Sequence, residues 1–307
     1  MIGSRDRRAT GIHIIDNTLR IVEVGVAGQV LALHALAQEE LPNPFVPAQL
    51  DNREQREELA QVLRQVRADR GIRFDHPVVA LNSPLFYLKH RPLMQAGRRA
   101  NRRHLFWEAH QFLGDESTEY GIDCALTQHG GFVVAARRYL LDLYMDVFDQ
   151  AGIENLDFDI APFALYNAFE TTDLLSDERP ELLVDIALSE ASIILIRDGE
   201  FAAVASWSWE DGLDADRRLA DLEERIGALV GEVSETEWPQ RMWLAGVAAR
   251  ESNWDTELPD RFSMPGALLD PFQDVDQSPL SPIDAPLLEA KSEFAVPAGL
   301  AFRGLFG

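Results

Sequence analysis

Two stretches of the sequence share one pattern, in which a short polar segment separates two runs of β-forming residues. The first is GIHIIDNTLRIVEV, residues 11–24, with the polar segment at 16–18. The second spans residues 181–196, where ELLVDIA and ASIILI flank the segment 188–190. Each pattern predicts a β-hairpin. Because the hairpins start about 170 residues apart, they indicate a duplicated α/β framework and not a single small domain.

The composition fits a folded protein and argues against a nucleic-acid partner. The chain has 307 residues, of which 46% are hydrophobic, so we expect a large core divided between two lobes. The 28 basic and 51 acidic residues give a net charge of -23. A surface this acidic repels phosphate backbones, which makes nucleic acid a poor general partner.

The sequence predicts a cytoplasmic protein. Its single cysteine, Cys124, excludes an internal disulfide and follows Ile122 and Asp123 in a predicted strand, so we expect a buried structural thiol. No run approaches the roughly 18 apolar residues of a membrane span, and the start of the sequence, MIGSRDRRAT, has no signal-peptide core. Association with a membrane is therefore expected to be indirect, through a membrane protein.

Strand and helix patterns alternate along the rest of the chain, as a layered α/β protein requires. We predict strands at 29–38, 77–81, 85–88, 120–126, 132–136, 154–160, 201–206 and 241–244. Helices are predicted at 54–70, 101–113, 137–150, from 162 and at 215–230. Residues 251–286 carry six prolines and many acids, which favours a surface segment with little regular structure, and 293–306 read as an apolar helix or turn.

Five stretches, in order, resemble PilM, an actin-like protein of type IV pilus assembly and a relative of the cell-division protein FtsA. They are GIHIIDNTLRIVEV, residues 132–169 from FVVAARRYLLDLYMD to FALYNAF, LLVDIALSEASIILIRDGE, LDPF and AVPAGLAFRGL. The resemblance implies an α/β, actin-like (ribonuclease H-like) duplicated two-lobe fold with an inserted small α/β subdomain. The implied boundaries are 1–76 and 133–178 for the first lobe, 77–132 for the inserted subdomain and 179–307 for the second lobe.

The nucleotide motifs depart from the family pattern. Phosphate hairpins of this family carry glycine in the turn, where backbone N–H groups approach the phosphates, and an aspartate that organises Mg²⁺. Here His13 takes the aspartate position and Ile15 the glycine position of the first hairpin. In the second hairpin Asp185 remains, but Ala187 replaces glycine. An isoleucine adds bulk at a phosphate contact, so weak or lost ATP binding is expected.

The adenosine side is also reduced. The family's adenosine loop is shortened to residues 244–247, and no lysine lies between Lys89 and Lys291. We therefore expect no cofactor, or ATP and Mg²⁺ only if nucleotide binding is retained. In that case the binding residues implied by the hairpins and the loop are Asp16, Asn17, Thr18, Asp185, Ser189 and Gly246.

The resemblance also implies a protein partner. In this family a groove on the inserted subdomain and first lobe captures the cytoplasmic N-terminal peptide of the membrane protein PilN. By position, the candidate partner-binding residues are Leu85, Tyr87, Lys89, Arg91, Phe106 and Trp107, although the aromatics fit a core equally well. The chain's basic cluster lies in the same region and indicates either a solvated face or a contact for an acidic partner or anionic lipid headgroups; it comprises Lys89, Arg91, Arg98, Arg99, Arg102 and Arg103.

Our leading interpretation is a PilM-like, non-catalytic scaffold on the cytoplasmic face of the inner membrane, working with other pilus assembly components. One alternative is an active actin-like ATPase that gates pilus assembly. Another is a cytoplasmic GspL-like component of a type II secretion system. Other chemistry has little support, because His104 and His110 lack the i, i+4 spacing of a zinc helix, and no P-loop or serine-hydrolase motif occurs.

Overall fold

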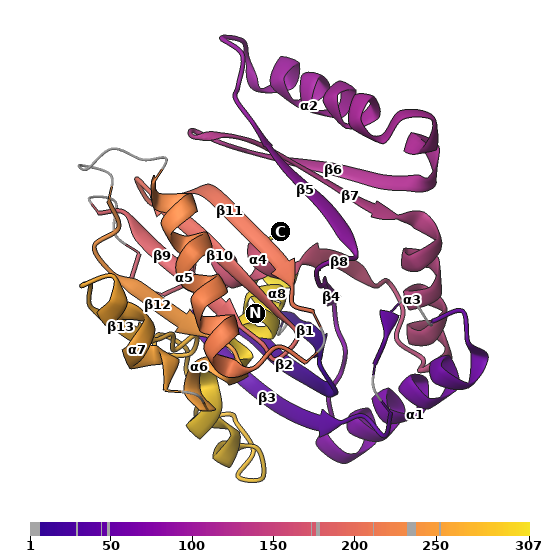
Figure 1. Cartoon of the computed structure of the whole chain (residues 1–307). Helices are drawn as coiled ribbons and strands as arrows, with labels where there is room; N and C mark the ends of the chain where they lie inside the picture. The colour runs from indigo at the N-terminus through magenta and orange to yellow at the C-terminus, as the bar shows by residue number, and fades with distance from the viewer. Residues whose placement is uncertain are drawn as a thin grey trace.

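The structure is a computed structural model and describes residues 7–28, 30–43, 45–47, 50–172, 174–175, 179–210, 212–231, 238–251 and 253–307. Within these residues the chain forms two five-stranded sheets and one three-stranded sheet (Figure 1). The first large sheet has the order β3-β2-β1-β4-β8 and comprises β1 (Arg7–Ile15), β2 (Thr18–Ala27), β3 (Val30–Glu40), β4 (Pro77–Leu81) and β8 (Asp157–Ile160). The second has the order β11-β10-β9-β12-β13 and comprises β9 (Glu181–Ile186), β10 (Glu190–Arg197), β11 (Glu200–Ser208), β12 (Met242–Ala245) and β13 (Gly266–Leu268).

The two large sheets have the same topology. In each, three strands form an antiparallel meander, and two further strands run parallel to the first strand of that meander. Parallel strands need long crossover connections, and each lobe supplies helices for them. The duplicated two-lobe α/β fold predicted from the paired hairpins is confirmed.

The first hairpin shows how the sequence sets the faces of a sheet. Ile12 pairs with Ile21 and Ile14 with Leu19, and all four side chains are buried in one core. Gly11 lies on the opposite face, where an added Cβ would overlap the Pro297 carbonyl oxygen. Alternate residues of a strand point to opposite faces, so one face packs on isoleucines and leucines while glycine lets a helix approach the other.

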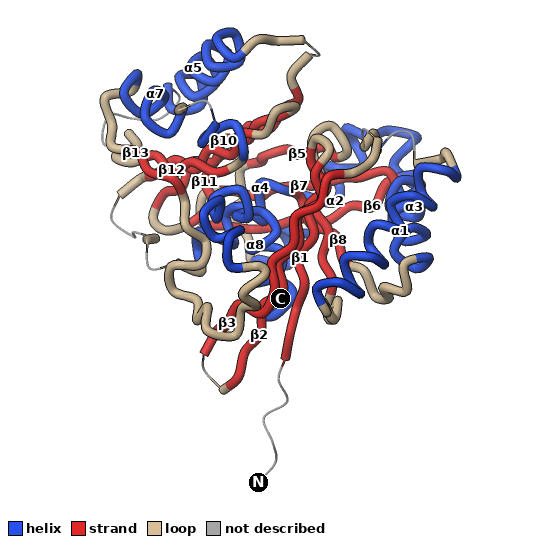
Figure 2. Tube along the Cα trace, turned by 90° about the horizontal axis from the view of Figure 1, so that it is seen from below, coloured by secondary structure: helices blue, strands red, loops and turns tan. Residues whose placement is uncertain are grey.

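The helices form three layers around the two large sheets (Figures 1 and 2). The outer face of the first sheet is covered by α1 (Arg53–Arg70) and α3 (Arg138–Gln150). Between the sheets lie α4 (Ala161–Glu170) and α8 (Ala295–Phe306), and the second sheet is covered by α5 (Ala215–Gly231), α6 (Val247–Glu251) and α7 (Trp254–Arg261). One shared core, built from both sheets and the central helices, joins the lobes.

The predicted start of the inserted subdomain at residue 77 is wrong. Residues 77–81 form β4, which lies between β1 and β8 in the first large sheet and is buried along its whole length. A continuous apolar run such as PVVAL is typical of a strand covered on both faces. The subdomain instead consists of β5 (Phe86–Arg91), α2 (Arg98–Leu113), the 3₁₀ helix η2 (Gly114–Glu119), β6 (Tyr120–Thr127) and β7 (Gly130–Arg137), with strand order β5-β7-β6.

Two expectations for the second lobe also need correction. The C-terminal helix α8, assigned by sequence to the second lobe, packs on β1, β2, β4 and α4 of the first lobe. Residues 251–286 are not a loose surface segment, because they contain α7 and β13, and β13 pairs with β12. Trp254, Leu258 and Phe272 are fully or almost fully buried there. These widely spaced apolar side chains fix the segment despite its prolines and acids. The 3₁₀ helix η4 (Ala285–Phe294) then leads into α8.

Candidate functional site

The turns of the two similar hairpins meet between the lobes. Asp16, in the first turn, has a φ of 54°, and its Oδ2 accepts a hydrogen bond of 3.0 Å from the Leu188 N–H in the second turn. In a phosphate-binding hairpin such a backbone N–H is available to an anion. Here the Asp16 carboxylate accepts the hydrogen bond from that N–H, and this hydrogen bond joins one lobe directly to the other.

Three carboxyl groups share this region. Burial is the main cause that raises the pKa of Asp185 to about 6; Arg20 opposes this rise and Asp16 adds to it. Burial, together with Asp185 and Asp16, also holds the pKa of Glu190 well above its ordinary value. Arg20 is itself buried and paired with Glu293 at 2.7 Å. The described residues contain no group of three or more His, Cys, Asp or Glu side chains arranged to hold a metal ion.

His13 has a structural role. Its Nε2 lies 3.0 Å from Asn82 Oδ1, and the Asn82 side-chain amide donates to the Ile14 carbonyl oxygen at 2.6 Å. Burial lowers the pKa of His13 to about 3, so the imidazole is neutral at physiological pH. A neutral, buried histidine that ties β1 to the segment after β4 cannot replace the charge of an aspartate toward Mg²⁺.

The remaining residues predicted for a nucleotide divide into two groups. Gly246 lies beside Asp185, since a Cβ on Gly246 would stand 2.7 Å from Asp185 Oδ1, and Ser189 lies in the turn that Asp16 contacts. Asn17 accepts a hydrogen bond from the Phe45 N–H at 3.3 Å, and Thr18 begins β2. The structure thus brings Asp16, Asp185, Ser189 and Gly246 together, whereas Asn17 and Thr18 hold local backbone.

These residues do not fit a Mg²⁺-bound triphosphate. The turn N–H of Leu188 is occupied by Asp16, and that carboxylate would repel a polyanion. The Arg218 guanidinium donates to the Leu188 carbonyl oxygen at 2.9 Å and lies 5.5 Å from the Trp209 ring centroid. Whether ATP binding is weak or lost nevertheless stays a prediction.

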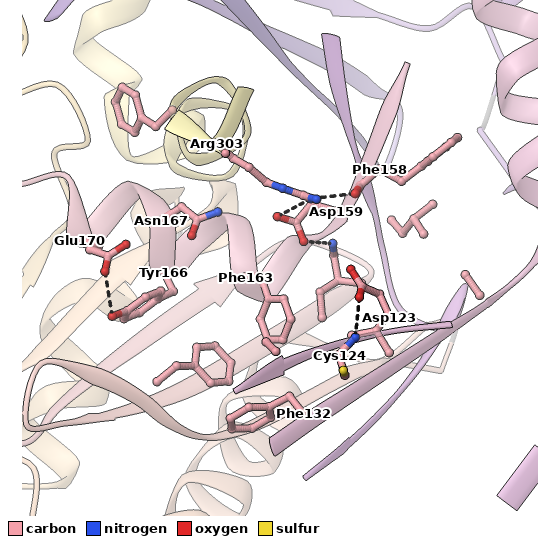
Figure 3. A pocket seen from close by; sticks show the side chains of 18 of the residues that line it. Asp123, Cys124, Phe132, Phe158, Asp159, Phe163, Tyr166, Asn167, Glu170 and Arg303 are labelled. Carbon is pink, nitrogen blue, oxygen red and sulfur yellow. Dashed lines mark hydrogen bonds and ion pairs between the residues drawn. The ribbon is translucent and has the colours of Figure 1, made fainter. Parts of the chain in front are cut away.

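A second site is an apolar groove between the inserted subdomain and the first lobe, shown in Figure 3. The cavity has a volume of about 660 Å³ and is lined mainly by β6, β8, α4 and α8. Phe132, Phe163 and Phe201 form an aromatic cluster in its wall, with ring centroids 4.8 to 6.2 Å apart in edge-to-face contacts. A cavity of this size and apolar character is typical of a ligand-binding site.

Few polar groups line the groove, and most are fixed by partners. Arg303 of α8 pairs with Asp159 at 2.9 Å and donates to the Phe158 carbonyl oxygen at 2.7 Å (Figure 3). Burial raises the pKa of Asp159, although Arg303 opposes that shift. The Tyr166 hydroxyl donates to the Gly199 carbonyl oxygen at 2.8 Å. The pair formed by Arg303 and Asp159 joins α8 to the edge of the first sheet and shapes one end of the groove.

The strand β6 forms one side of the groove with an unpaired edge. Among the described strands its one sheet partner is β7, so its other edge is open to the groove. At that edge the Cys124 N–H bonds to the adjacent Asp123 carboxylate at 2.7 Å. Burial raises the pKa of the Cys124 thiol, and the expectation that this thiol is buried is confirmed. An open strand edge beside apolar pockets can pair with an extended peptide.

The six residues predicted for partner binding do not line this groove. Leu85 packs against the first-lobe core, Phe106 packs against the subdomain core, and Tyr87 and Trp107 are exposed. Lys89 lies over the Phe112 ring and Arg91 pairs with Glu108. The groove residues come instead from stretches that the sequence had associated with the fold, 132–169 and 295–305, and from β6. The one available signal was a set of three polar residues, Tyr166, Asn167 and Glu170, on an otherwise apolar helix.

No known family model and no curated protein sequence matches the chain. Among solved structures, a chain titled "PilM-PilN type IV pilus biogenesis complex" is similar with a TM-score of 0.78 and 21% identity, over 97% of this chain and 98% of that one. The ethanolamine utilization protein EutJ from Carboxydothermus hydrogenoformans matches with a TM-score of 0.50 and 12% identity, over 99% and 92%. The cytoplasmic domain of EpsL, an inner membrane component of the type II secretion system of Vibrio cholerae, matches with a TM-score of 0.47 and 10% identity, over 93% and 94%.

The duplicated sheets and the first of these neighbours define the class: the chain has an actin-like two-lobe α/β fold. The alignment with that neighbour spans nearly all of both chains, so it includes the inserted subdomain. The resemblance noted in the sequence is therefore confirmed at the level of the fold. Across the described residues, no helix combines the length and the apolar character needed to cross a membrane.

Proposed function

We propose that the chain is a PilM-like component of a type IV pilus or related secretion assembly, and that its groove binds the N-terminal cytoplasmic peptide of a PilN-like membrane protein. The observation that carries this proposal is the apolar groove of about 660 Å³ between the inserted subdomain and the first lobe. The similarity of fold to a chain of a PilM-PilN complex supports it. In this role the chain acts on the cytoplasmic face of the inner membrane.

The groove is suited to an extended peptide with apolar side chains. The open edge of β6 offers backbone hydrogen bonds, which give affinity without depending on sequence. The aromatic cluster of Phe132, Phe163 and Phe201 gives the groove an apolar wall that would select for apolar side chains of the peptide. The Asp159 and Arg303 pair adds a polar group of fixed position at one end.

We also propose that ATP binding is lost or weak and that the chain is a scaffold without catalysis. The contact between Asp16 and the Leu188 N–H supports this, because it replaces a phosphate contact with a bond between the two lobes. Titration calorimetry with Mg-ATP tests the point, and micromolar binding would contradict it.

The peptide proposal is tested by titrating a synthetic N-terminal peptide of the PilN-like protein encoded nearest to this chain, followed by fluorescence anisotropy. Phe306, at the mouth of the groove, is 66% exposed, so Phe306→Glu should fold normally. Loss of one apolar contact is worth about 1.5 to 3 kcal/mol, so the variant should weaken binding by at least about tenfold.

The matched control is Ile283→Glu, which places the same charge at a residue that is 67% exposed and lies outside the groove lining. This variant should bind the peptide as the wild type does. Absence of peptide binding to the wild type would contradict the proposed partner. Equal binding by both variants would contradict the groove as the binding site.

A further inference from the structure

One face of the helix α2 (Arg98–Leu113) has no partner in the fold. Asn101, Leu105 and Ala109 are buried against the subdomain. On the opposite side, Arg99, Arg103, Trp107 and His110 follow one another at spacings of three and four residues and are all exposed, so they form a single stripe. We call these four residues the α2 stripe. Its large apolar side chain is Trp107, which is 56% exposed.

The arginines of the stripe form no ion pair or side-chain hydrogen bond with the other described residues. Of the basic cluster seen in the sequence, Lys89 lies over the Phe112 ring, Arg91 pairs with Glu108, and Arg102 pairs with Asp123. No ion pair or hydrogen bond to another described residue involves the side chains of the remaining three, Arg98, Arg99 and Arg103. On a chain with a net charge of -23, three neighbouring cations without a partner among the described residues favour the binding of an external anion.

The position of α2 separates this charge from the acidic lobes. The helix lies on the side of the β5-β7-β6 sheet that faces away from β10 and β11 (Figure 1). A helix has a diameter of about 10 Å, and charges are screened beyond roughly 8 Å at physiological ionic strength. The electrostatic interaction between the protein and a surface that touches the α2 stripe is therefore determined by the arginines and not by the net charge of the molecule.

The start of α2 strengthens the attraction for an anion. Its first turn contains Arg98 and Arg99, has no acidic residue, and receives no side-chain cap. The partial positive charge of a helix N-terminus disfavours cations in the first turn. The sequence thus places two arginines where they oppose helix stability, and a neighbouring anionic surface would relieve that opposition. Two acids follow the other end of the helix, Asp115 and Glu116 in η2, and Glu116 pairs with Arg137 at 3.2 Å.

We propose that the α2 stripe contacts an anionic lipid bilayer directly, which amends the expectation of a purely indirect membrane association. Exposed arginines attract anionic headgroups, and a tryptophan between them is the side chain preferred at a membrane interface. The stripe lies on one convex helix and not in a channel, which suits a flat surface. The choice of a bilayer over other polyanions rests on the proposed function, which places the chain beside a membrane.

The test is co-sedimentation of the full chain with vesicles of phosphatidylcholine that contain or lack phosphatidylglycerol. Binding is expected only to the anionic vesicles and should weaken as salt is raised. Each arginine near a charged bilayer contributes roughly fivefold, so Arg99→Gln with Arg103→Gln should weaken the binding about 25-fold. Trp107→Ala should weaken it with the arginines intact.

The matched control is Arg53→Gln with Arg217→Gln. It makes the same change in net charge at side chains that are 85% and 76% exposed on or near other helices, and it should leave vesicle binding unchanged. Equal loss in both double variants would show a net-charge effect and overturn the proposal. No binding to anionic vesicles, or equal binding to neutral ones, would also overturn it.

Two further outcomes separate this proposal from the proposed function. Binding of polyglutamate or DNA through Arg99 and Arg103, without vesicle binding, would identify an acidic macromolecule as the partner and refute the bilayer. Because the vesicles contain no peptide, vesicle binding combined with a failed peptide titration would refute the groove's proposed ligand and leave the α2 stripe standing.

Discussion

The packing of α8 leads to a prediction in which one substitution has opposite effects at two positions. Gly299 lies in the middle of α8, where it touches α4. A Cβ at residue 299 would overlap the Ala164 carbonyl oxygen and stand 2.7 Å from Ala164 C and 2.8 Å from Ala168 N. Gly227 lies in the interior of α5, where a Cβ would meet nothing within 4 Å. Both are helical glycines, so Gly→Ala brings the same gain in helix propensity at each.

The magnitudes follow from these contacts. Alanine is more favourable than glycine in a helix interior by about 1 kcal/mol, so Gly227→Ala should raise the free energy of unfolding by up to that amount. Carbon atoms in contact normally lie about 3.5 to 4.0 Å apart, so α8 and α4 would have to separate by roughly 1 Å in Gly299→Ala. The obstacle is backbone and cannot rotate away. Overpacking of this kind costs about 1 to 3 kcal/mol or more, which outweighs the propensity gain.

Urea denaturation of the two variants, followed by circular dichroism, measures the difference. Gly299→Ala should lose on the order of 2 kcal/mol and Gly227→Ala should gain. Because α8 also supplies Phe302, Arg303 and Phe306 to the groove, Gly299→Ala should weaken peptide binding as well. If both variants were stabilised equally, the close packing of α8 on α4 would be refuted.

Two other predictions concern buried charge. The raised pKa values of Asp185 and Glu190 mean that the folded state prefers their protonated forms, so the contribution of Asp185 to stability is lost as pH rises through about 6, and that of Glu190 is lost as pH rises through its own raised pKa. Glu190→Gln should therefore stabilise the protein at neutral pH, and a gain that grows toward acidic pH would contradict this. Glu293→Gln leaves the buried Arg20 without its counter-charge and should lower the free energy of unfolding, measured by urea denaturation, by about 3 to 5 kcal/mol. Glu257→Gln, at an exposed ion pair, should lower it by less than about 1 kcal/mol. Equal losses in the two variants would contradict this prediction.

Local patterns in the sequence predicted much of the fold. The hairpins at 11–24 and 181–196 follow from alternating apolar residues around a polar turn, and this information lies within a few residues. The assignment of β4 and α8 failed because it depends on which distant elements they pack against. Nothing within residues 295–306 indicates that this helix packs on the first sheet; that is decided by Gly11, which leaves room for the helix.

The candidate sites were predicted less well, for a related reason. The departures at His13 and Ile15 were visible in the sequence, but the bond from Asp16 to Leu188 joins residues 172 positions apart and has no local signal. The groove draws on β6, β8, α4 and α8, each of which reads locally as ordinary core. The basic cluster was visible as a run of charge, yet only the structure shows which arginines already have partners.

The return of α8 to the first lobe bears on how the protein folds during its synthesis. The ribosome releases β1, β2 and β4 long before residues 295–306. The face of β1 that carries Gly11 therefore stays without its covering helix α8 while the whole second lobe is synthesised. Neither lobe can then complete its folding independently of the other. Such a nascent chain would expose apolar sheet surface for most of its translation, which makes it a natural client of chaperones that bind emerging polypeptides.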